Sequence, residues 1–269
     1  MRKVAQLGRR SFLLQAGRGM FALWSEVSFG LGRRGLAIAL GGSGLATACT
    51  QPLIVAPQGT VPAPTPTAVA QLDPVEYQRV IAQFVNAYVL IRGNEVALVD
   101  TGLPGTGAQF ADVLTGAGLG WDAVKHLIIT HYHDDHVGAM GEIMEAATGA
   151  TIYAGAEDIG QINTTQTIQA VGDGDEVFGL QIITTPGHTL GHISILDPVG
   201  SLFVAGDALV NNENTLAVSP AQFTTDMAMA QESVKKIATF TFEKAVFGHG
   251  DPIESGASAA VAELAQSLE

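Results

Sequence analysis

The 269-residue sequence contains a single cysteine, Cys49. One thiol cannot form a disulfide within its own chain. The same scarcity excludes a cysteine-rich metal site, because such sites need several thiolates around one ion. Any metal site in this chain would therefore consist of other residue types.

Basic residues are scarce beyond residue 70. Residues 71–269 contain six Lys and Arg against 25 Asp and Glu, a formal charge of −19. Binding of nucleic acid depends largely on Lys and Arg that neutralise phosphates, and an acidic protein repels the phosphate backbone. We therefore expect no nucleic-acid partner.

The N-terminal region contains an uncharged run that is too short to cross a bilayer. Residues 35–48 are 14 small and apolar residues, whereas a membrane-spanning helix needs about 20, so the run fits the apolar part of a signal peptide. LGRRSFLLQAG (7–17) resembles a twin-arginine export signal. LATAC, which ends at Cys49, resembles a lipoprotein cleavage box, although Ala46 stands where such boxes usually have Leu. Residues 1–49 are thus predicted to be an export signal, with Cys49 as the lipidation site.

A proline-rich tether is predicted over residues 50–74, because residues 52–74 contain six of the 11 prolines and show no apolar periodicity. The folded domain is expected over 75–269. This order places the protein at the outer face of the bacterial cytoplasmic membrane or in the periplasm, in contact with the membrane only through its N-terminal anchor. The alternative is a cleaved signal or a misplaced start, with Cys49 incidental.

Short apolar segments alternate with amphipathic ones in the domain, which predicts an α/β fold in layers. The expected strands are 79–92, 95–100, 124–130, 180–185, 192–196, 201–206 and 244–250. The expected helices are 136–149, 226–240 and 255–269. Thr224 and Thr225 are available to cap the second of these helices.

Three of the chain's seven histidines lie within residues 130–138, THYHDDHVG. Clustered imidazoles and carboxylates are costly to bury unless something pairs with them, and a divalent cation is the obvious partner. More His and Asp residues follow expected strands, in PGHTLGH (186–192), AGD (205–207) and FGHG (247–250). Polar side chains on loops at strand ends are typical of active sites in open sheets.

These segments resemble the landmarks of the metallo-β-lactamase-fold hydrolases. HYHDDH (131–136) fits the superfamily signature His-x-His-x-Asp-His, VDTG (99–102) precedes it, and the three later segments follow in the superfamily's order. The resemblance covers residues 76–255. It implies an αββα sandwich with a two-metal site at one edge, in the branch that contains glyoxalase II and the lactonases.

The resemblance also implies seven metal ligands, three for each ion and one shared. They are His131, His133 and His188 for the first ion, Asp135, His136 and His249 for the second, and Asp207 for both. Nitrogen and carboxylate ligands suit zinc, and three protein ligands leave one position open for water. The expected cofactor is two Zn²⁺, with iron as the alternative metal.

Other polar residues near the signature have less direct roles. Asp100 is expected to support the ligands by accepting a hydrogen bond. His192 has either such a supporting role or an ordinary packing role. His126, inside an expected strand, is interpreted as structural, and Asp134 as solvated or hydrogen-bonded locally.

The predicted activity is metal-dependent hydrolysis of a small ester, thioester or lactone by a hydroxide that bridges two zinc ions. Asp135 would orient the hydroxide or relay its proton. The alternatives are a β-lactamase, an oxidoreductase similar to the persulfide dioxygenases with one iron, and a non-catalytic exported metal-binding protein.

Comparison with individual branches narrows the substrate only to a small carbonyl compound. Glyoxalase II has an additional helical domain that binds glutathione, whereas 20 residues follow His249 here. The lactonases have Tyr where this chain has Val210. The β-lactamase subclass with a cysteine ligand is excluded, because Cys49 is the only cysteine and lies outside the expected domain. The other dinuclear subclass lacks the shared aspartate, so Asp207 argues against it. Residues 211–223, expected to be an irregular loop, are the predicted substrate side of the site.

Overall fold

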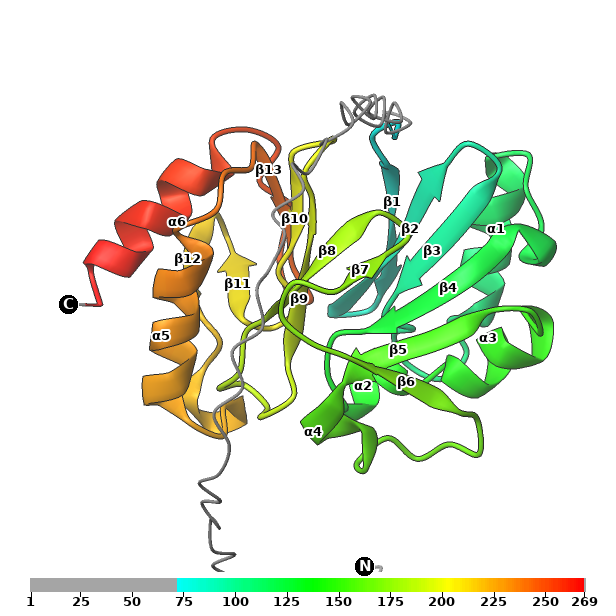
Figure 1. Cartoon of the computed structure of the whole chain (residues 1–269), viewed down its shortest axis with the longest axis horizontal. Coiled ribbons are helices and arrows are strands. Elements are labelled where there is room, and N and C mark those ends of the chain that lie inside the picture. The colour runs from blue at the N-terminus through cyan, green and yellow to red at the C-terminus, as the bar shows by residue number, and fades with distance from the viewer. Residues whose placement is uncertain (1–71, 269) are drawn as a thin grey trace, which may run out of the picture. The chain divides into compact units, whose positions relative to one another are not determined.

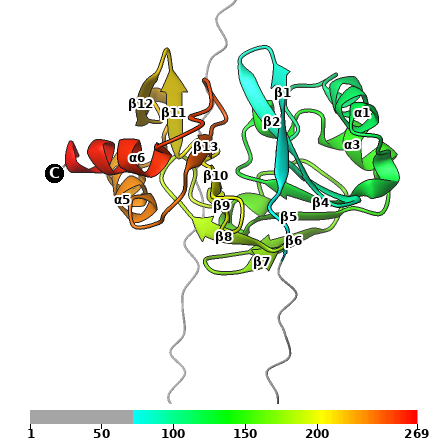
Figure 2. The same ribbon diagram turned by 90° about the horizontal axis from the view of Figure 1, so that it is seen from above.

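The computed structural model describes residues 72–268. The predicted export signal, Cys49 and nearly all of the predicted tether lie outside the described residues. Two β-sheets face each other, and helices cover the outer face of each sheet (Figures 1 and 2). The predicted αββα sandwich is therefore confirmed. Among residues 72–268, no helix is both long and apolar enough to cross a membrane.

The first sheet has six strands in the order β1-β2-β3-β4-β5-β6. Their bounds are β1 Glu76–Ala82, β2 Val85–Arg92, β3 Glu95–Val99, β4 Val124–Ile129, β5 Thr151–Gly155 and β6 Ile168–Val171. The first three strands are antiparallel, and β3 to β6 are parallel. The helical segments of this half are α1 Gly107–Gly116, η1 Trp121–Ala123, α2 Asp134–Val137, α3 Met140–Ala146 and α4 Ala156–Ile159.

The second sheet has five strands in the order β13-β10-β9-β8-β7. Their bounds are β7 Glu176–Val177, β8 Leu180–Thr184, β9 Ile193–Asp197, β10 Leu202–Val204 and β13 Lys244–Val246. A separate hairpin consists of β11 Leu209–Asn212 and β12 Thr215–Val218. The helical segments of this half are η2 Ala221–Phe223, α5 Met227–Ile237 and α6 Ala257–Gln266.

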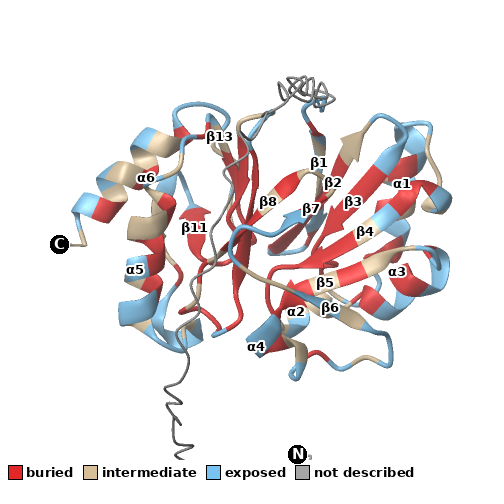
Figure 3. Ribbon diagram, in the orientation of Figure 1, coloured by how far each residue is buried: buried red, intermediate tan, exposed pale blue. Residues whose placement is uncertain are grey.

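Side chains that alternate along the buried strands fill three hydrophobic layers. On β4, Leu127 packs between the first sheet and its helices, whereas the adjacent Ile128 packs between the two sheets. On the second sheet, Ile195 faces the other sheet and Leu196 faces the layer under α5 and α6. Both faces of these strands are buried, which explains why they are almost continuously apolar in sequence (Figure 3).

The ends of four strands meet at one edge of the sandwich. Parallel strands β3 and β4 lead to Asp100 and His131, and parallel strands β10 and β13 lead to Asp207 and His249. Backbone hydrogen bonds join the two sheets at this edge, from Ile193 N to Thr130 O at 2.9 Å and from Asn86 N to Gly248 O at 2.8 Å. The fold thereby brings residues that are distant in sequence to one place.

Two expected elements are each divided in two. The expected strand 79–92 is a hairpin of β1 and β2, with its turn at Gln83 and Phe84. Gln83 has a left-handed backbone (φ 63°), which glycine usually supplies, and so no typical turn residue marks this position in the sequence. The expected helix 136–149 is divided into α2 and α3, which Gly138 and Ala139 separate.

Two further expectations were wrong in detail. The cap of α5 is Asp226, whose carboxylate accepts a hydrogen bond from Met229 N at 3.0 Å, and neither Thr224 nor Thr225 caps this helix. The expected irregular loop 211–223 contains the end of β11, the strand β12 and η2. Its apolar and polar residues alternate only briefly, so the pattern was too short to indicate a hairpin.

Candidate metal centre

Three imidazoles from two different loops converge on one point. His188 Nε2 lies 3.2 Å from His131 Nε2 and 2.9 Å from His133 Nδ1, and the last two nitrogens are 3.0 Å apart. Around a tetrahedral zinc ion with Zn–N bonds of about 2.0–2.1 Å, ligand nitrogens would be about 3.3 Å apart. Burial lowers the pKa of all three side chains, that of His188 to about 4. Burial therefore favours the neutral form of these imidazoles, which is the form that binds a metal ion.

A second group consists of Asp135, His136 and His249. Asp135 Oδ2 lies 3.3 Å from His249 Nε2 and 3.9 Å from His136 Nε2. Burial tends to lower the pKa of His249, but the nearby carboxylates of Asp135 and Asp207 outweigh it and raise that pKa to about 10. For His136 too, burial is outweighed, by Asp207 and Asp100, and its pKa lies well above the usual range. The carboxylates around these two histidines therefore stabilise a positive charge at the centre of the group.

Asp207 lies between the two groups. Its Oδ2 is 3.4 Å from His188 Nε2 and 3.2 Å from His249 Nε2, while its Oδ1 is 3.4 Å from His136 Nε2. Burial alone would raise the pKa of Asp207, but His136 more than compensates and keeps it well below its usual range. An ionised carboxylate thus faces both groups, in the position that a shared ligand would need.

Unpaired buried atoms test whether these residues fit metal ions. His136 Nε2 and Asp207 Oδ1 are fully buried, yet neither has a hydrogen-bond partner among residues 72–268. Buried polar atoms without partners are rare in stable proteins, because each carries a desolvation cost of about 1–3 kcal/mol. The two atoms lie 3.4 Å from each other and belong to groups of side chains close enough to hold one ion, so the seven residues fit two divalent cations.

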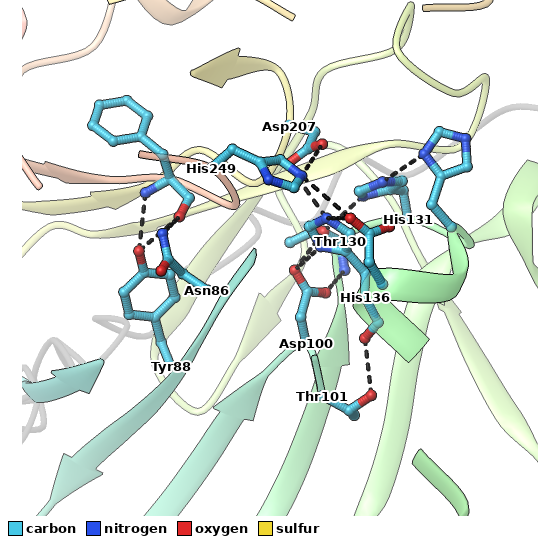
Figure 4. A network of polar contacts seen from close by, with 12 residues as sticks. Asn86, Tyr88, Asp100, Thr101, Thr130, His131, His136, Asp207 and His249 are labelled. Atoms are coloured by element: carbon cyan, nitrogen blue, oxygen red, sulfur yellow. Dashed lines mark hydrogen bonds and ion pairs between the residues drawn. The ribbon is translucent and has the colours of Figure 1, made fainter. Parts of the chain in front are cut away.

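Asp100 contacts His136 directly and reaches His131 through Thr130 (Figure 4). It accepts hydrogen bonds from His136 Nδ1 at 2.8 Å and from the Thr130 hydroxyl at 2.8 Å. That hydroxyl lies 3.0 Å from His131 Nδ1 and, since its proton is given to Asp100, it accepts from the imidazole. Asp100 therefore fixes the tautomers of His131 and His136 and leaves the Nε2 atom of each able to bind a metal ion, which favours the supporting role predicted for it.

His192 holds the backbone of Asp207. Its Nε2 accepts a hydrogen bond from Asp207 N at 3.0 Å, so its Nδ1 carries the proton and donates to Thr185 Oγ1 at 2.8 Å. A side chain at Gly206 (φ 56°) would come within 2.7 Å of His192 Nε2, so glycine is required beside Asp207. These hydrogen bonds favour a supporting role for His192, which stays a prediction.

The hairpin turn between β1 and β2 holds His249. Its Nδ1 donates a hydrogen bond to Phe84 O at 2.9 Å, and the phenyl ring of Phe84 stacks on the imidazole with ring centres 6.0 Å apart. The Tyr88 hydroxyl donates to Phe247 O at 2.7 Å and so anchors the strand end before His249 (Figure 4). A Cβ at Gly248 would lie 2.0 Å from Asp207 Oδ1, so only glycine fits there.

Sequence reasoning missed Asp158, a buried carboxylate on α4. It accepts hydrogen bonds from Gly191 N at 2.7 Å, from the Thr189 hydroxyl at 2.6 Å and from Tyr132 N at 3.3 Å. It therefore ties the loop of His188 to the segment between His131 and His133. Burial raises the pKa of Asp158. No local motif surrounds this residue, and only the contacts between distant segments identify it.

Two polar residues are not among the ligands. Asp134 is exposed at the start of α2. His126 lies on β4 between the rings of Tyr153 and Phe178, with centres 5.8 Å and 5.3 Å away. Both placements agree with the roles expected from the sequence.

A pocket of about 860 Å³ lies over the ligands. His133, Asp135, His188, Asp207 and His249 contribute to its floor and walls. The segment after β12 forms the far wall through Ser219, Pro220 and residues 222–225. Of these, Ser219, Pro220, Gln222 and Phe223 belong to the predicted substrate-side loop 211–223. The metal positions are therefore accessible to a small molecule.

Comparisons with known proteins agree with this architecture. The family model described as the metallo-beta-lactamase superfamily matches residues 80–249. The probable metallo-hydrolase YflN of Bacillus subtilis is 30% identical over 218 residues, which cover 64% of this chain and 82% of YflN. A hydroxyacylglutathione hydrolase of Fuscovulum blasticum is 38% identical over 107 residues, which cover 38% of this chain and 40% of that protein.

A solved structure gives the same fold. The metallo-beta-lactamase family protein TTHA1429 of Thermus thermophilus superposes with a TM-score of 0.56 at 24% identity, over 72% of this chain and 78% of that chain. The family match covers more than half of the sequence and includes every residue of the two ligand groups. This chain belongs to the metallo-beta-lactamase superfamily.

Proposed function

We propose that the protein is a hydrolase that uses two divalent metal ions, most suitably zinc, to cleave a small ester, thioester or lactone. One observation carries the proposal. Seven His and Asp side chains converge beneath an accessible pocket that five of them line, and Asp207 lies within 3.4 Å of histidines of both expected ligand groups.

The residues define what each ion would contact. His131, His133 and His188 would hold the first ion, Asp135, His136 and His249 the second, and Asp207 would contribute to both. Bound there, two such ions supply Lewis-acid strength and make water acidic enough to act as a nucleophile near neutral pH.

Asp135 is the best-placed residue to handle the proton of an attacking water. Its side chain lines the pocket and is 24% exposed, whereas that of Asp207 is only 5% exposed. Burial would raise the pKa of Asp135, but its interaction with His249 outweighs burial and lowers it. An ionised carboxylate at this position can accept a hydrogen bond from water and orient it toward a substrate carbonyl.

Similarity to known hydrolases supports an ester or thioester substrate. The relatives include hydroxyacylglutathione hydrolases and a fungal thioesterase, PkgB, which is 27% identical over 175 residues covering 64% of this chain and 47% of that protein. Asp207 argues against a β-lactamase, since the dinuclear β-lactamases that the sequence resembles lack this shared carboxylate.

A hydrolysis panel tests the proposal. Activated esters, thioesters, lactones and penicillins would be offered to the zinc-loaded protein and to His133→Ala, which removes one nitrogen from the first group. We expect zinc-dependent turnover of at least one of the first three classes, above that of penicillins, and its loss in the variant. Turnover that survives His133→Ala, or a preference for penicillins over every ester, would contradict the proposal.

A further inference from the structure

Two solvent-exposed phenylalanines line the pocket over the metal positions. Phe84 is 62% exposed and Phe223 is 60% exposed, and both line the pocket. They are the only aromatic residues among the large apolar side chains that are exposed in residues 72–268. Exposed rings at the mouth of a concave site are typical of a ligand-binding surface, because covering them removes apolar area from water.

The two rings lie beside different groups of ligands. Phe84 stacks on His249, which belongs to the second group. Phe223 belongs to η2, and the chain that follows it is bonded to the loop of His188 in the first group, through Thr225 N to His188 O at 3.0 Å. A substrate centred on the ligands would therefore extend toward a phenyl ring on either side.

The described side chains that line the pocket offer no cationic partner to a substrate anion. None of the residues that line it, within residues 72–268, is Lys or Arg. Asp134, Asp135 and Asp207 contribute three carboxylates, which would offset three of the four positive charges that two divalent ions bring. The other polar residues on the far wall, such as Gln222 and Thr224, are uncharged. A substrate carboxylate would therefore lose its hydration without gaining a cationic side chain.

We infer that the pocket selects uncharged esters, thioesters or lactones that have an apolar group on each side of the reacting carbonyl, with Phe223 contacting one group and Phe84 the other. This inference rests on the proposed hydrolase function. It also separates this chain from the glutathione-thioester hydrolases that it resembles, since the substrate named for those proteins carries glutathione carboxylates.

The charge preference can be measured with two matched esters. 4-Nitrophenyl butyrate and 4-nitrophenyl hemisuccinate have the same leaving group and the same number of acyl carbons, but only the second has a terminal carboxylate. We expect kcat/KM of the zinc-loaded protein for the butyrate to exceed that for the hemisuccinate by about tenfold or more. Equal values would overturn the charge part of the inference.

A substitution in the pocket wall provides the reverse test. Gln222 is exposed and is not one of the metal-binding residues, so Gln222→Lys adds a positive charge to the wall without disturbing the core. Gln222→Lys should raise kcat/KM for the hemisuccinate and so reduce the ratio of kcat/KM between the butyrate and the hemisuccinate. The uncharged Gln222→Met should leave that ratio unchanged. If both variants leave the ratio unchanged, the wall does not sense substrate charge and the inference is wrong.

The phenyl contacts are tested by Phe84→Ala and Phe223→Ala. Each should raise KM for 4-nitrophenyl butyrate by about tenfold, because one apolar group of the substrate loses its contact. The variant that loses the contact with the acyl chain should have a smaller effect on 4-nitrophenyl acetate, whereas the variant that loses the contact with the leaving group should affect both esters alike. Val199→Ala, at an apolar site that is 44% exposed and does not line the pocket, is the matched control and should leave KM unchanged. Unchanged KM in both phenylalanine variants would overturn the claim that Phe84 and Phe223 contact the substrate.

These results are separable from failure of the hydrolase proposal. If the zinc-loaded protein hydrolyses no ester, thioester or lactone, the proposed function itself fails. If it hydrolyses them but shows neither the charge preference nor the phenylalanine effects, the function stands and the substrate inference alone is wrong.

Discussion

The carboxylate of Asp100 accepts a hydrogen bond from His136 Nδ1 at 2.8 Å. The same carboxylate reaches the other ligand group through the hydroxyl of Thr130. Asp100 has a left-handed backbone (φ 59°) directly after β3, a conformation that Asp tolerates better than most residues. One residue at the end of one strand thus orients an imidazole in each half of the candidate centre.

Asp100→Asn should weaken binding of the second metal ion by about 10- to 100-fold, the range typical when a residue that supports a ligand is changed. Asp100 Oδ2 accepts from His136 and from the Thr130 hydroxyl, while Oδ1 accepts from Thr130 N at 2.8 Å. An amide presents one oxygen and one NH₂ group, so Asn cannot accept from all three donors as the carboxylate does. Zinc titration against a chelator gives the affinities. Asp112→Asn, on an exposed position of α1, is the control. If both variants bind zinc like the unsubstituted protein, Asp100 does not position the ligand.

Asp158→Ala should lower the free energy of unfolding by about 2–4 kcal/mol, because it leaves three hydrogen-bond donors without their acceptor in a buried site. It should also weaken zinc binding at the first group, since the loop of His188 loses its tie to the segment around Tyr132. Urea unfolding and zinc titration measure the two effects. The exposed neighbour Glu157 supplies the control, Glu157→Ala. A stability loss without any change in zinc affinity would show that Asp158 is structural only.

Local motifs allowed the expected ligands to be predicted from the sequence. Most residues that hold the ligands in place could be identified only from the folded structure. His131, His133 and His136 fall within six residues, and the loops of His188, Asp207 and His249 are short and glycine-flanked. Asp158 has no such surroundings, because its partners lie 26 to 33 residues away and contact it only after the chain has folded.

The strands too could be predicted only where a local sequence pattern marks them. Runs of Val, Ile and Leu on β4 and β9 identify buried strands, since both faces of each are covered. The turn at Gln83 and Phe84 lacks glycine, proline and asparagine, and so one apolar run concealed two strands. That turn places Phe84 O against His249, so the missed turn also concealed a contact of the site.

His126 should make the protein less stable as the pH falls below about 6.5. Burial lowers its pKa, against a smaller opposing effect of Glu95, and its Nδ1 is buried without a hydrogen-bond partner in the described part of the chain. The unfolded chain therefore takes up a proton at a higher pH than the folded protein does, which favours unfolding at acid pH.

His126→Phe keeps a ring between Tyr153 and Phe178 but removes the titrating group. We expect Tm at saturating zinc to fall less between pH 7.5 and pH 5.5 in this variant than in the unsubstituted protein. All ligand histidines are present in both proteins, so the difference isolates His126. Parallel pH dependences would contradict the assignment.

Export and lipidation remain proposals from the sequence, and Cys49 lies outside the described residues. We propose that Cys49 carries a lipid at the outer face of the cytoplasmic membrane. In bacteria fed a palmitate analogue, the protein should be labelled and should sediment with membranes, while Cys49→Ala should be unlabelled and released. An unlabelled protein found wholly in the cytoplasm would contradict the proposal.

The metal content of the purified protein tests the central claim most directly. Elemental analysis after dialysis should give close to two zinc ions per chain. Asp207→Asn should lose the second ion to a chelator before the first, because the first group keeps three imidazoles while the shared anionic ligand is gone. One iron and no zinc in the unsubstituted protein, or equal retention of both ions by Asp207→Asn, would contradict a two-metal hydrolase that shares Asp207.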